Sequence, residues 1–437
     1  MNLDSLLGPA PWPRRVATAA LFLVPALTLT VRSGYSYGAA LLLIGALCSM
    51  PRWLRAKQDR WTWVFAVAMA GMGAFWLQLA DPQEGLGAWD RPSKYALGIA
   101  CLLFVSRCAP RPRAQFWGLL AGCVGAGAVA LWQVYAEGVA RATGFPSVHV
   151  NSAIQWGNLA LLMGTMLALQ TIALREQLGR SSVFVAGLAV LLALNASVLS
   201  QSRGGWLALL LALPIILYLL WRYYRRELWR LLGGAAAVLV VLGAANHAVL
   251  MERWQLMEKE TQVYDVRRSA DNSVGQRLEH WRFAWELGLE RPVLGWGMRG
   301  YLAEKEKRVA AGQYEPSILE FVNAHNELLD MFVKAGIAGV AWLLLFYAVP
   351  LAMFWPTRAR VAAYAQCSAD VRSQMLALRL AGVCIPLLYA GFGTTVVFLG
   401  PNSGIMFYLF MTMLTWAAVL GMDGQYARGP CAASSGG

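Results

Sequence analysis

The segment 321–334, "FVNAHNELLDMFVK", places a histidine directly before a long apolar run. An imidazole titrates near neutral pH, so His325 is suited to taking a proton from a hydroxyl group. The spacing also predicts a helix from about Ser317, with His325 on the same face as Ile318, Phe321 and Phe332. A histidine on such a face is alternatively a core residue with a satisfied hydrogen bond.

Arg203 lies in "SQSRGGW", a tight loop between two apolar runs. A guanidinium can bind an anion through two parallel hydrogen bonds. The adjoining Gly204 and Gly205 allow the backbone to approach a ligand closely, because they have no side chain. The alternative is an arginine that reaches out to lipid phosphates.

Arg277 lies in the first turn of a helix predicted from "NSVGQRLEHWRFAWELGLERP". The helix dipole makes a cation unfavourable there, and a phosphate bound at the helix N-terminus would offset this. The alternative is a salt bridge to Asp271 or Glu279. The helix should stop at Arg291–Pro292, and its apolar side chains form one stripe: Val274, Leu278, Trp281, Trp285 and Leu289.

The elements that must position these residues are membrane helices. The chain has 437 residues, of which 58% are hydrophobic and 14% are charged, with a mean hydropathy of +0.48. This composition is typical of an all-α polytopic membrane protein. Apolar runs long enough to cross about 30 Å of hydrocarbon predict about twelve transmembrane helices. They lie near 16–32, 35–50, 61–80, 95–109, 115–135, 154–174, 182–200, 205–221, 231–251, 336–356, 377–399 and 405–421.

Every second loop is rich in Lys and Arg, which predicts that these loops and both termini are cytoplasmic. Anionic lipid headgroups then account for the net charge of +13, so membrane lipids are expected partners and nucleic acid is not. We predict three parts: a transmembrane bundle of about nine spans over 1–251, a helical periplasmic lid domain over 252–335, and about three spans with a short cytoplasmic tail over 336–437. The chemically interesting residues gather at the outer rim, whereas the spans are almost free of ionisable groups.

Four motifs in this order resemble the O-antigen ligase and polymerase superfamily, and most closely the O-antigen ligases. They are "SRGG" at 202–205, "GQRLEHW" at 275–281, "RPVLGWG" at 291–297, and His325-Asn326 followed by Gly336-x-x-Gly339. The resemblance covers the whole topology, and its motifs span about 200–339.

The resemblance implies an enzyme in the inner membrane of a Gram-negative bacterium, with its active site facing the periplasm. It would transfer a glycan from undecaprenyl pyrophosphate to a sugar hydroxyl of lipid A-core, in lipopolysaccharide biosynthesis, without a metal or another cofactor. Arg203 and Arg277 match the family's pyrophosphate-binding arginines, and His325 matches its essential histidine. Asn326 would orient the imidazole or a sugar hydroxyl.

A glycosyl pyrophosphate already has a good leaving group, so the enzyme must mainly stabilise the departing anion and deprotonate the acceptor. Attack opposite the leaving group predicts inversion at the anomeric carbon. Three alternatives remain: an O-antigen polymerase, a protein O-oligosaccharyltransferase, and a flippase or other transporter of lipid-linked glycans.

Overall fold

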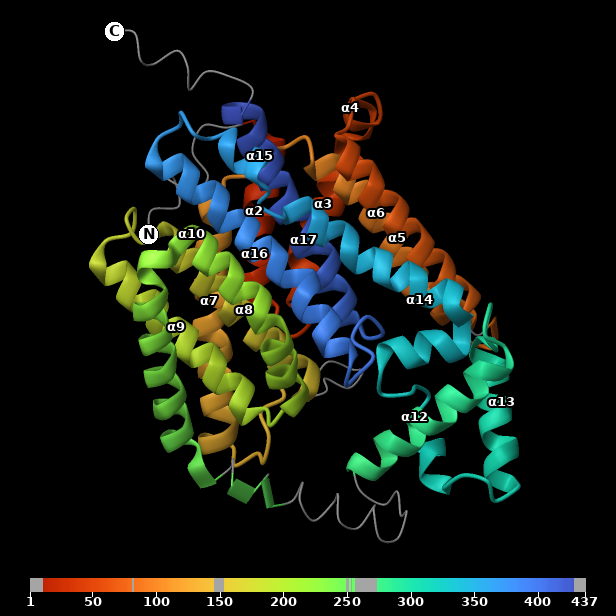
Figure 1. The fold of residues 1–437 in the computed structure, drawn as a ribbon. Helices are drawn as coiled ribbons and strands as arrows, with labels where there is room; N and C mark the ends of the chain where they lie inside the picture. The colour runs from red at the N-terminus through yellow and green to blue at the C-terminus, as the bar shows by residue number, and fades with distance from the viewer. Residues whose placement is uncertain are drawn as a thin grey trace, which may run out of the picture.

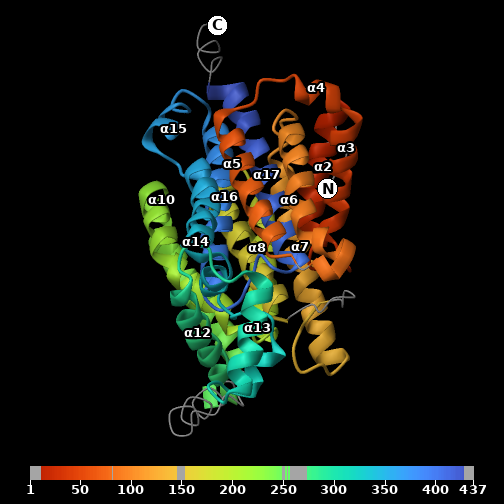
Figure 2. The same cartoon turned by 90° about the vertical axis from the view of Figure 1, so that its right-hand side faces the viewer.

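The computed structural model describes residues 11–80, 82–144, 153–248, 251–252, 254–255 and 273–427. Within these ranges the chain forms helices, turns and loops and no β-strand, as Figure 1 shows. The fold is therefore an all-α, multi-pass membrane fold, as predicted. The short helices α4 (Met50–Leu54) and α15 (Arg358–Ala362) lie at one end of the bundle, and α12 and α13 lie at the other (Figures 1 and 2).

All twelve predicted spans overlap helices of the structure. The N-terminal helices are α2 (Trp12–Leu27), α3 (Tyr35–Cys48), α5 (Arg60–Gln78), α6 (Asp90–Val105), α7 (Arg113–Leu131), α8 (Ala153–Leu174), α9 (Arg180–Leu199) and α10 (Arg203–Ala245). The C-terminal ones are α14 (Glu327–Phe354), α16 (Ala369–Gly393) and α17 (Asn402–Met422). Two predicted spans fall on α10, which is broken at Tyr224. Among the described residues, seven helices are long and apolar enough to cross a membrane, and α3 is a shorter apolar helix.

Small residues let the helices of the bundle approach closely. A side chain at Gly122 of α7 would meet the Pro25 carbonyl oxygen of α2 at 2.1 Å, and one at Gly157 of α8 would meet the Ser200 hydroxyl at 1.8 Å. In lipid, where burial of apolar surface gives little net gain between helices, such close contact is a main source of association. The helices α8, α16 and α17 are buried over most of their length.

Two helices outside the bundle form a lid with its own small core. These are α12 (Ser273–Glu290) and α13 (Gly297–Ala310), followed by a 3₁₀ turn, Pro316–Glu320. Buried apolar residues of these elements, of the connections next to them and of the start of α14 form a cluster separate from the core of the bundle: Phe283, Ala284, Leu287, Tyr301, Tyr314, Ile318, Ala324 and Val333. The predicted lid, 252–335, also includes residues that lie outside the described ranges, and the division into three parts stays a prediction.

The predicted end of the first lid helix is confirmed, since α12 ends at Glu290. The predicted apolar stripe is not the buried face of α12. Trp285 is 53% exposed and Leu289 is 54% exposed, whereas Phe283 and Leu287 are fully buried. The buried face of α12 is thus set by contact with the lid core and with α14. Val274 belongs to the same stripe, and its side chain lies outside the described part.

The predicted helix from Ser317 to Phe332 is also wrong. The 3₁₀ turn ends at Glu320, and α14 begins only at Glu327. Between them the backbone is irregular, and His325 has φ of +52°, in the left-handed region. This region costs roughly 1–2 kcal/mol for a residue with a Cβ, so the contacts around this segment must impose it.

Gly336 breaks α14 into two helices where the lid meets the span. Its φ is +65° and its ψ is −165°, a conformation that is essentially restricted to glycine. A Cβ at this position would lie 2.2 Å from the Val293 carbonyl oxygen. Gly336 therefore packs closely against the loop between α12 and α13.

Candidate active site

One cavity brings together the three residues that the sequence selected for chemistry. It has a volume of about 230 Å³ and lies where the lid meets the N-termini of α8 and α10 and the C-terminus of α16. Arg203, Arg277 and His325 all line it. Its remaining lining residues are Arg141, Ile154, Gln201, Ser202, Gly204, Gln276, Phe321 and Thr395.

Arg203 is the first residue of α10, and the loop before it is held by side-chain contacts. The Ser202 hydroxyl donates to Asn158 Oδ1 of α8 at 2.7 Å, so the side chain of this N-cap residue does not cap the helix. The first-turn N–H groups of α10 therefore have no side-chain acceptor from their N-cap, and the positive end of the helix dipole adds to the Arg203 charge. Both features suit an anion in the cavity.

The two glycines after Arg203 serve different contacts. A Cβ at Gly204 would meet Thr395 Oγ1 at 2.1 Å, and one at Gly205 would meet Asn158 Oδ1 at 2.6 Å. Gly204 lines the cavity, so close approach of the backbone to a ligand remains a prediction there. Gly205 is not among the lining residues, and it packs α10 against α8 instead.

Arg277 enters the cavity from the first part of α12. The sequence suggested two carboxylates as alternative partners of Arg277. Glu279 forms a salt bridge with Arg282 at 2.6 Å, and Asp271 lies outside the described residues. The neighbouring Gln276 also lines the cavity, and its amide donates to Glu320 at 3.3 Å. This contact joins the start of α12 to the segment that precedes His325.

The His325 ring lies in an aromatic setting at the edge of the cavity. Its centroid is 4.5 Å from that of Phe321 and 5.2 Å from that of His280, both edge to face. Burial, the nearby Arg277 charge and Lys305 together lower the pKa of His325 to about 4. The imidazole is therefore neutral at physiological pH and can accept a proton.

Two buried lysines hold the segment that carries His325. Lys305 Nζ of α13 donates to the Ile318 and Phe321 carbonyl oxygens at 3.0 and 2.7 Å. Lys334 Nζ of α14 donates to the Val322 carbonyl oxygen at 2.9 Å. Buried charges are tolerated only with such compensation, so these contacts fix the backbone of the segment.

Asp330 completes this set of anchors. It forms an ion pair with Lys334 at 2.8 Å, and its Oδ1 accepts a hydrogen bond from the Ala324 N–H at 2.9 Å. This i,i+4 pair is buried, and its carboxylate also binds the backbone next to His325. Lys334 Nζ further lies 4.9 Å from the centre of the Tyr301 ring.

Asn326 caps α14 and does not line the cavity. Its Oδ1 accepts hydrogen bonds from the Leu328 and Leu329 N–H groups at 3.0 and 3.2 Å, and its Nδ2 donates to the Thr394 carbonyl oxygen at 3.1 Å. Asn326 thus ties the start of α14 to the C-terminus of α16. Its neighbour His325 is positioned through this cap, and contact of Asn326 with a sugar is not supported by the geometry.

Nothing in the sequence pointed to Arg141 or Thr395 as residues of the site. Arg141 comes from the connection before α8, and its Nε donates to the Ser200 carbonyl oxygen at 3.1 Å. It places a third guanidinium at the cavity, beside the loop of Arg203. Arg141 and Thr395 both lie more than 50 residues outside the stretch that holds the motifs, 200–339, and only the fold brings them to the site.

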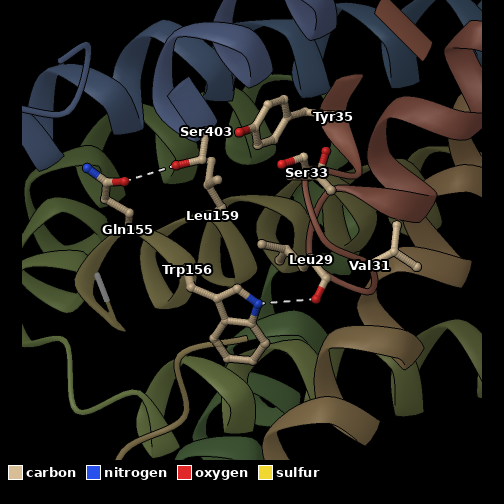
Figure 3. Close-up of a pocket in the computed structure, with 9 residues that line it drawn as sticks. Leu29, Val31, Ser33, Tyr35, Gln155, Trp156, Leu159 and Ser403 are labelled. Carbon is tan, nitrogen blue, oxygen red and sulfur yellow. Dashed lines mark hydrogen bonds between the residues drawn. The ribbon is translucent and has the colours of Figure 1, made fainter. Parts of the chain in front are cut away.

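A much smaller cavity lies beside the residues that follow Ile154 (Figure 3). Its volume of about 20 Å³ is close to that of one water molecule. Gln155 accepts a hydrogen bond from Ser403 at 2.9 Å, and Trp156 Nε1 donates to the Leu29 carbonyl oxygen at 3.2 Å (Figure 3). These bonds fix the start of α8, which forms one wall of the larger cavity.

Residues 188–347 match the family model described as O-antigen ligase. This stretch contains Arg203, Arg277 and His325. Over this stretch the chain is similar to the O-antigen ligases. Similarity to this family indicates an enzymatic reaction of the glycosyltransferase type. The residues that line the cavity all lie within the matched stretch, except for Arg141, Ile154 and Thr395.

Two relatives extend the comparison. An O-antigen ligase of Salmonella typhimurium is 31% identical over 149 residues, which are 33% of this chain and 34% of that protein. An uncharacterised protein of Haemophilus influenzae is 25% identical over 391 residues, 88% of this chain and 94% of that protein. The likeness to the named ligase thus covers about a third of each chain.

Proposed function

We propose that this protein is an O-antigen ligase in the inner membrane of a Gram-negative bacterium. It transfers a glycan from undecaprenyl pyrophosphate to a sugar hydroxyl of lipid A-core, on the periplasmic face. The observation that carries the proposal is the cavity lined jointly by Arg203, Arg277 and His325. The match of 188–347 to the O-antigen ligase family supports it independently.

The arginines bind the pyrophosphate of the donor. A guanidinium matches phosphate geometry and stays charged at any physiological pH. Arg203 and Arg277 approach from the bundle and from the lid, so a pyrophosphate between them would join the two parts. At the edge of the membrane, where water is partly excluded, their charge stabilises the departing anion more strongly than it would in bulk water.

His325 acts as the general base. Its imidazole takes the proton of the acceptor hydroxyl, and the oxygen attacks the anomeric carbon from the face opposite the pyrophosphate. The bond from that carbon to the phosphate oxygen breaks, its electron pair leaves on undecaprenyl pyrophosphate, and the configuration inverts. Bound pyrophosphate offsets the Arg277 charge, which otherwise lowers the pKa of His325, so the base becomes stronger when the donor is in place.

Product identity tests this proposal. Purified protein receives a lipid-pyrophosphate-linked glycan with or without lipid A-core, and the products are analysed by gel shift and mass. Glycan on lipid A-core, with an inverted linkage, is the expected result. Longer lipid-linked glycans formed without lipid A-core would show a polymerase instead, glycan on a protein acceptor would show a protein O-oligosaccharyltransferase, and no covalent product would favour a transporter.

A further inference from the structure

The opposite end of the bundle holds a second cavity, of about 650 Å³. It lies where α5 begins and where α6 and α17 end, next to α15, far from α12 and α13 (Figures 1 and 2). Four cationic side chains line it: Lys57, Arg60, Arg107 and Arg360. The proposed transfer reaction uses none of them.

Two of these guanidinium groups are fixed by backbone carbonyl groups. Arg360 Nη1 donates to the Ala352 and Trp355 carbonyl oxygens at 2.6 and 2.8 Å, and Arg107 Nη1 donates to the Lys57 carbonyl oxygen at 3.2 Å. A guanidinium has five N–H donors, so bonds from one terminal nitrogen leave capacity for an anion. The positions of both groups are thus set before any ligand binds.

The two carboxylates that line this cavity are engaged elsewhere. Asp59 Oδ1 accepts a hydrogen bond from the Trp61 N–H at 2.8 Å, as the N-cap of α5. Asp423 pairs with Arg379 at 3.0 Å and accepts a hydrogen bond from the Tyr364 hydroxyl. The cavity therefore has an excess of positive charge.

Apolar side chains lie at this charged site and farther along α5. Trp61, Trp416 and Leu420 line the cavity beside the cations. On α5, Trp63 is 52% exposed and Val67 is 57% exposed, and the two are neighbours on one helix face at i and i+4. A soluble anion has no use for such a surface, whereas a phospholipid places acyl chains along helices below its phosphate.

We propose that this cavity binds the headgroup of an anionic phospholipid, with the phosphate held by Arg107 and Arg360 and the acyl chains along the exposed face of α5. Basic pockets between transmembrane helices are suited to such headgroups. Tryptophan at the same level is typical of the interface between membrane and water. The lipid would join the start of α5 and the end of α6 to α15, through Arg107 and Arg360.

Native mass spectrometry of protein released from nanodiscs tests this inference. We expect wild-type protein to retain phosphatidylglycerol in preference to phosphatidylcholine, and the double substitution Arg107→Gln with Arg360→Gln to lower that retention by about tenfold or more. Arg107→Gln alone, which removes one exposed side chain, should lower it by a smaller factor. The control is the double substitution Arg52→Gln with Arg55→Gln. It makes the same change of charge at two exposed residues, one in α4 and one directly after it. This control variant should retain the lipid as the wild type does.

Three results would overturn the inference. They are equal retention of both lipids by the wild type, an equal loss in the control variant, and displacement of the lipid by millimolar inorganic phosphate. The first would leave no site for an anion, the second would show nonspecific surface attraction, and the third would assign the cavity to a soluble anion. Thermal unfolding in detergent without added lipid shows whether each variant is folded.

Discussion

At the scale of single residues, the environment of His325 determines what it can do. Burial, Arg277 and Lys305 lower its pKa to about 4, so the ring is uncharged when the donor approaches. An imidazolium could not accept a proton, and it would add a further positive charge to a site that already contains three arginines. The low pKa keeps the base in its active form.

This pKa gives a prediction for the dependence of transfer on pH. A base with a lowered pKa stays deprotonated as pH falls, until the pH approaches that pKa. The value of kcat/KM for the donor reports on the free enzyme. We therefore expect kcat/KM to stay constant as the pH is lowered from about 6.5 to about 5, and to fall as the pH approaches the His325 pKa of about 4. An acidic limb centred near 6.5 would mean that His325 titrates as in water and that the arrangement around Arg277 is wrong.

At the scale of elements, the His325 segment shows where sequence patterns fail. Apolar spacing predicted a continuous helix through His325, because Ile318, Phe321 and Phe332 are spaced for one face. The structure has an irregular connection there, since Lys305 and Lys334 donate hydrogen bonds to its carbonyl groups and Asp330 accepts one from its Ala324 N–H. Lys305 comes from α13, and the apolar spacing gives no sign of any of these hydrogen bonds.

Lys305 gives a test of this anchoring. Lys305→Met leaves the Ile318 and Phe321 carbonyl groups without their donor, at a cost of about 1–3 kcal/mol for the buried Ile318 group, and it releases the backbone that positions His325. We expect transfer to slow by roughly 10²-fold and the melting temperature to fall, with donor affinity nearly unchanged. Measurements of kcat, donor Kd and Tm separate these effects.

The control is Lys307→Met on the same helix, where the side chain is 73% exposed and pairs with Glu304 at the surface. It should leave transfer and Tm close to wild-type values. If Lys305→Arg, which keeps the charge and the donors, did not recover part of the lost rate, the anchoring role would be refuted.

Gly336 gives a second prediction at this scale. Gly336→Ala would place a Cβ 2.2 Å from the Val293 carbonyl oxygen at a φ of +65°. The matched control is Gly297→Ala, with a φ of +67° and no atom within 4 Å of the new Cβ. Strain alone costs the control roughly 1–2 kcal/mol, so Gly336→Ala should lower Tm clearly further. Equal shifts in Tm for both variants would show that the contact with the α12–α13 loop is not tight.

Over the whole molecule, the sequence was most informative about the membrane. All twelve predicted spans overlap helices, because apolar length follows directly from the thickness of a bilayer. The motif residues Arg203, Arg277 and His325 proved to line one cavity, although together they span more than a hundred positions of the chain. The buried face of α12 and the presence of Arg141 could not be predicted, because both depend on how the lid packs on the bundle.

The orientation of the bundle is a further prediction. With both termini cytoplasmic, the lid must face the periplasm. An impermeant maleimide applied to cells with a permeabilised outer membrane should label Glu315→Cys in the lid, and it should not label Arg55→Cys at the end of α4. Both positions are exposed, so accessibility does not differ between them. The reverse labelling pattern would put the candidate active site in the cytoplasm.

The central claim is that the cavity of Arg203, Arg277 and His325 is the site of glycan transfer. Its most direct test measures donor affinity and transfer rate in parallel for the wild type, His325→Ala and Arg277→Ala. We expect His325→Ala to lose transfer by about 10²–10⁴-fold with donor affinity retained, and Arg277→Ala to lose donor affinity as well. Normal turnover in His325→Ala would contradict the account.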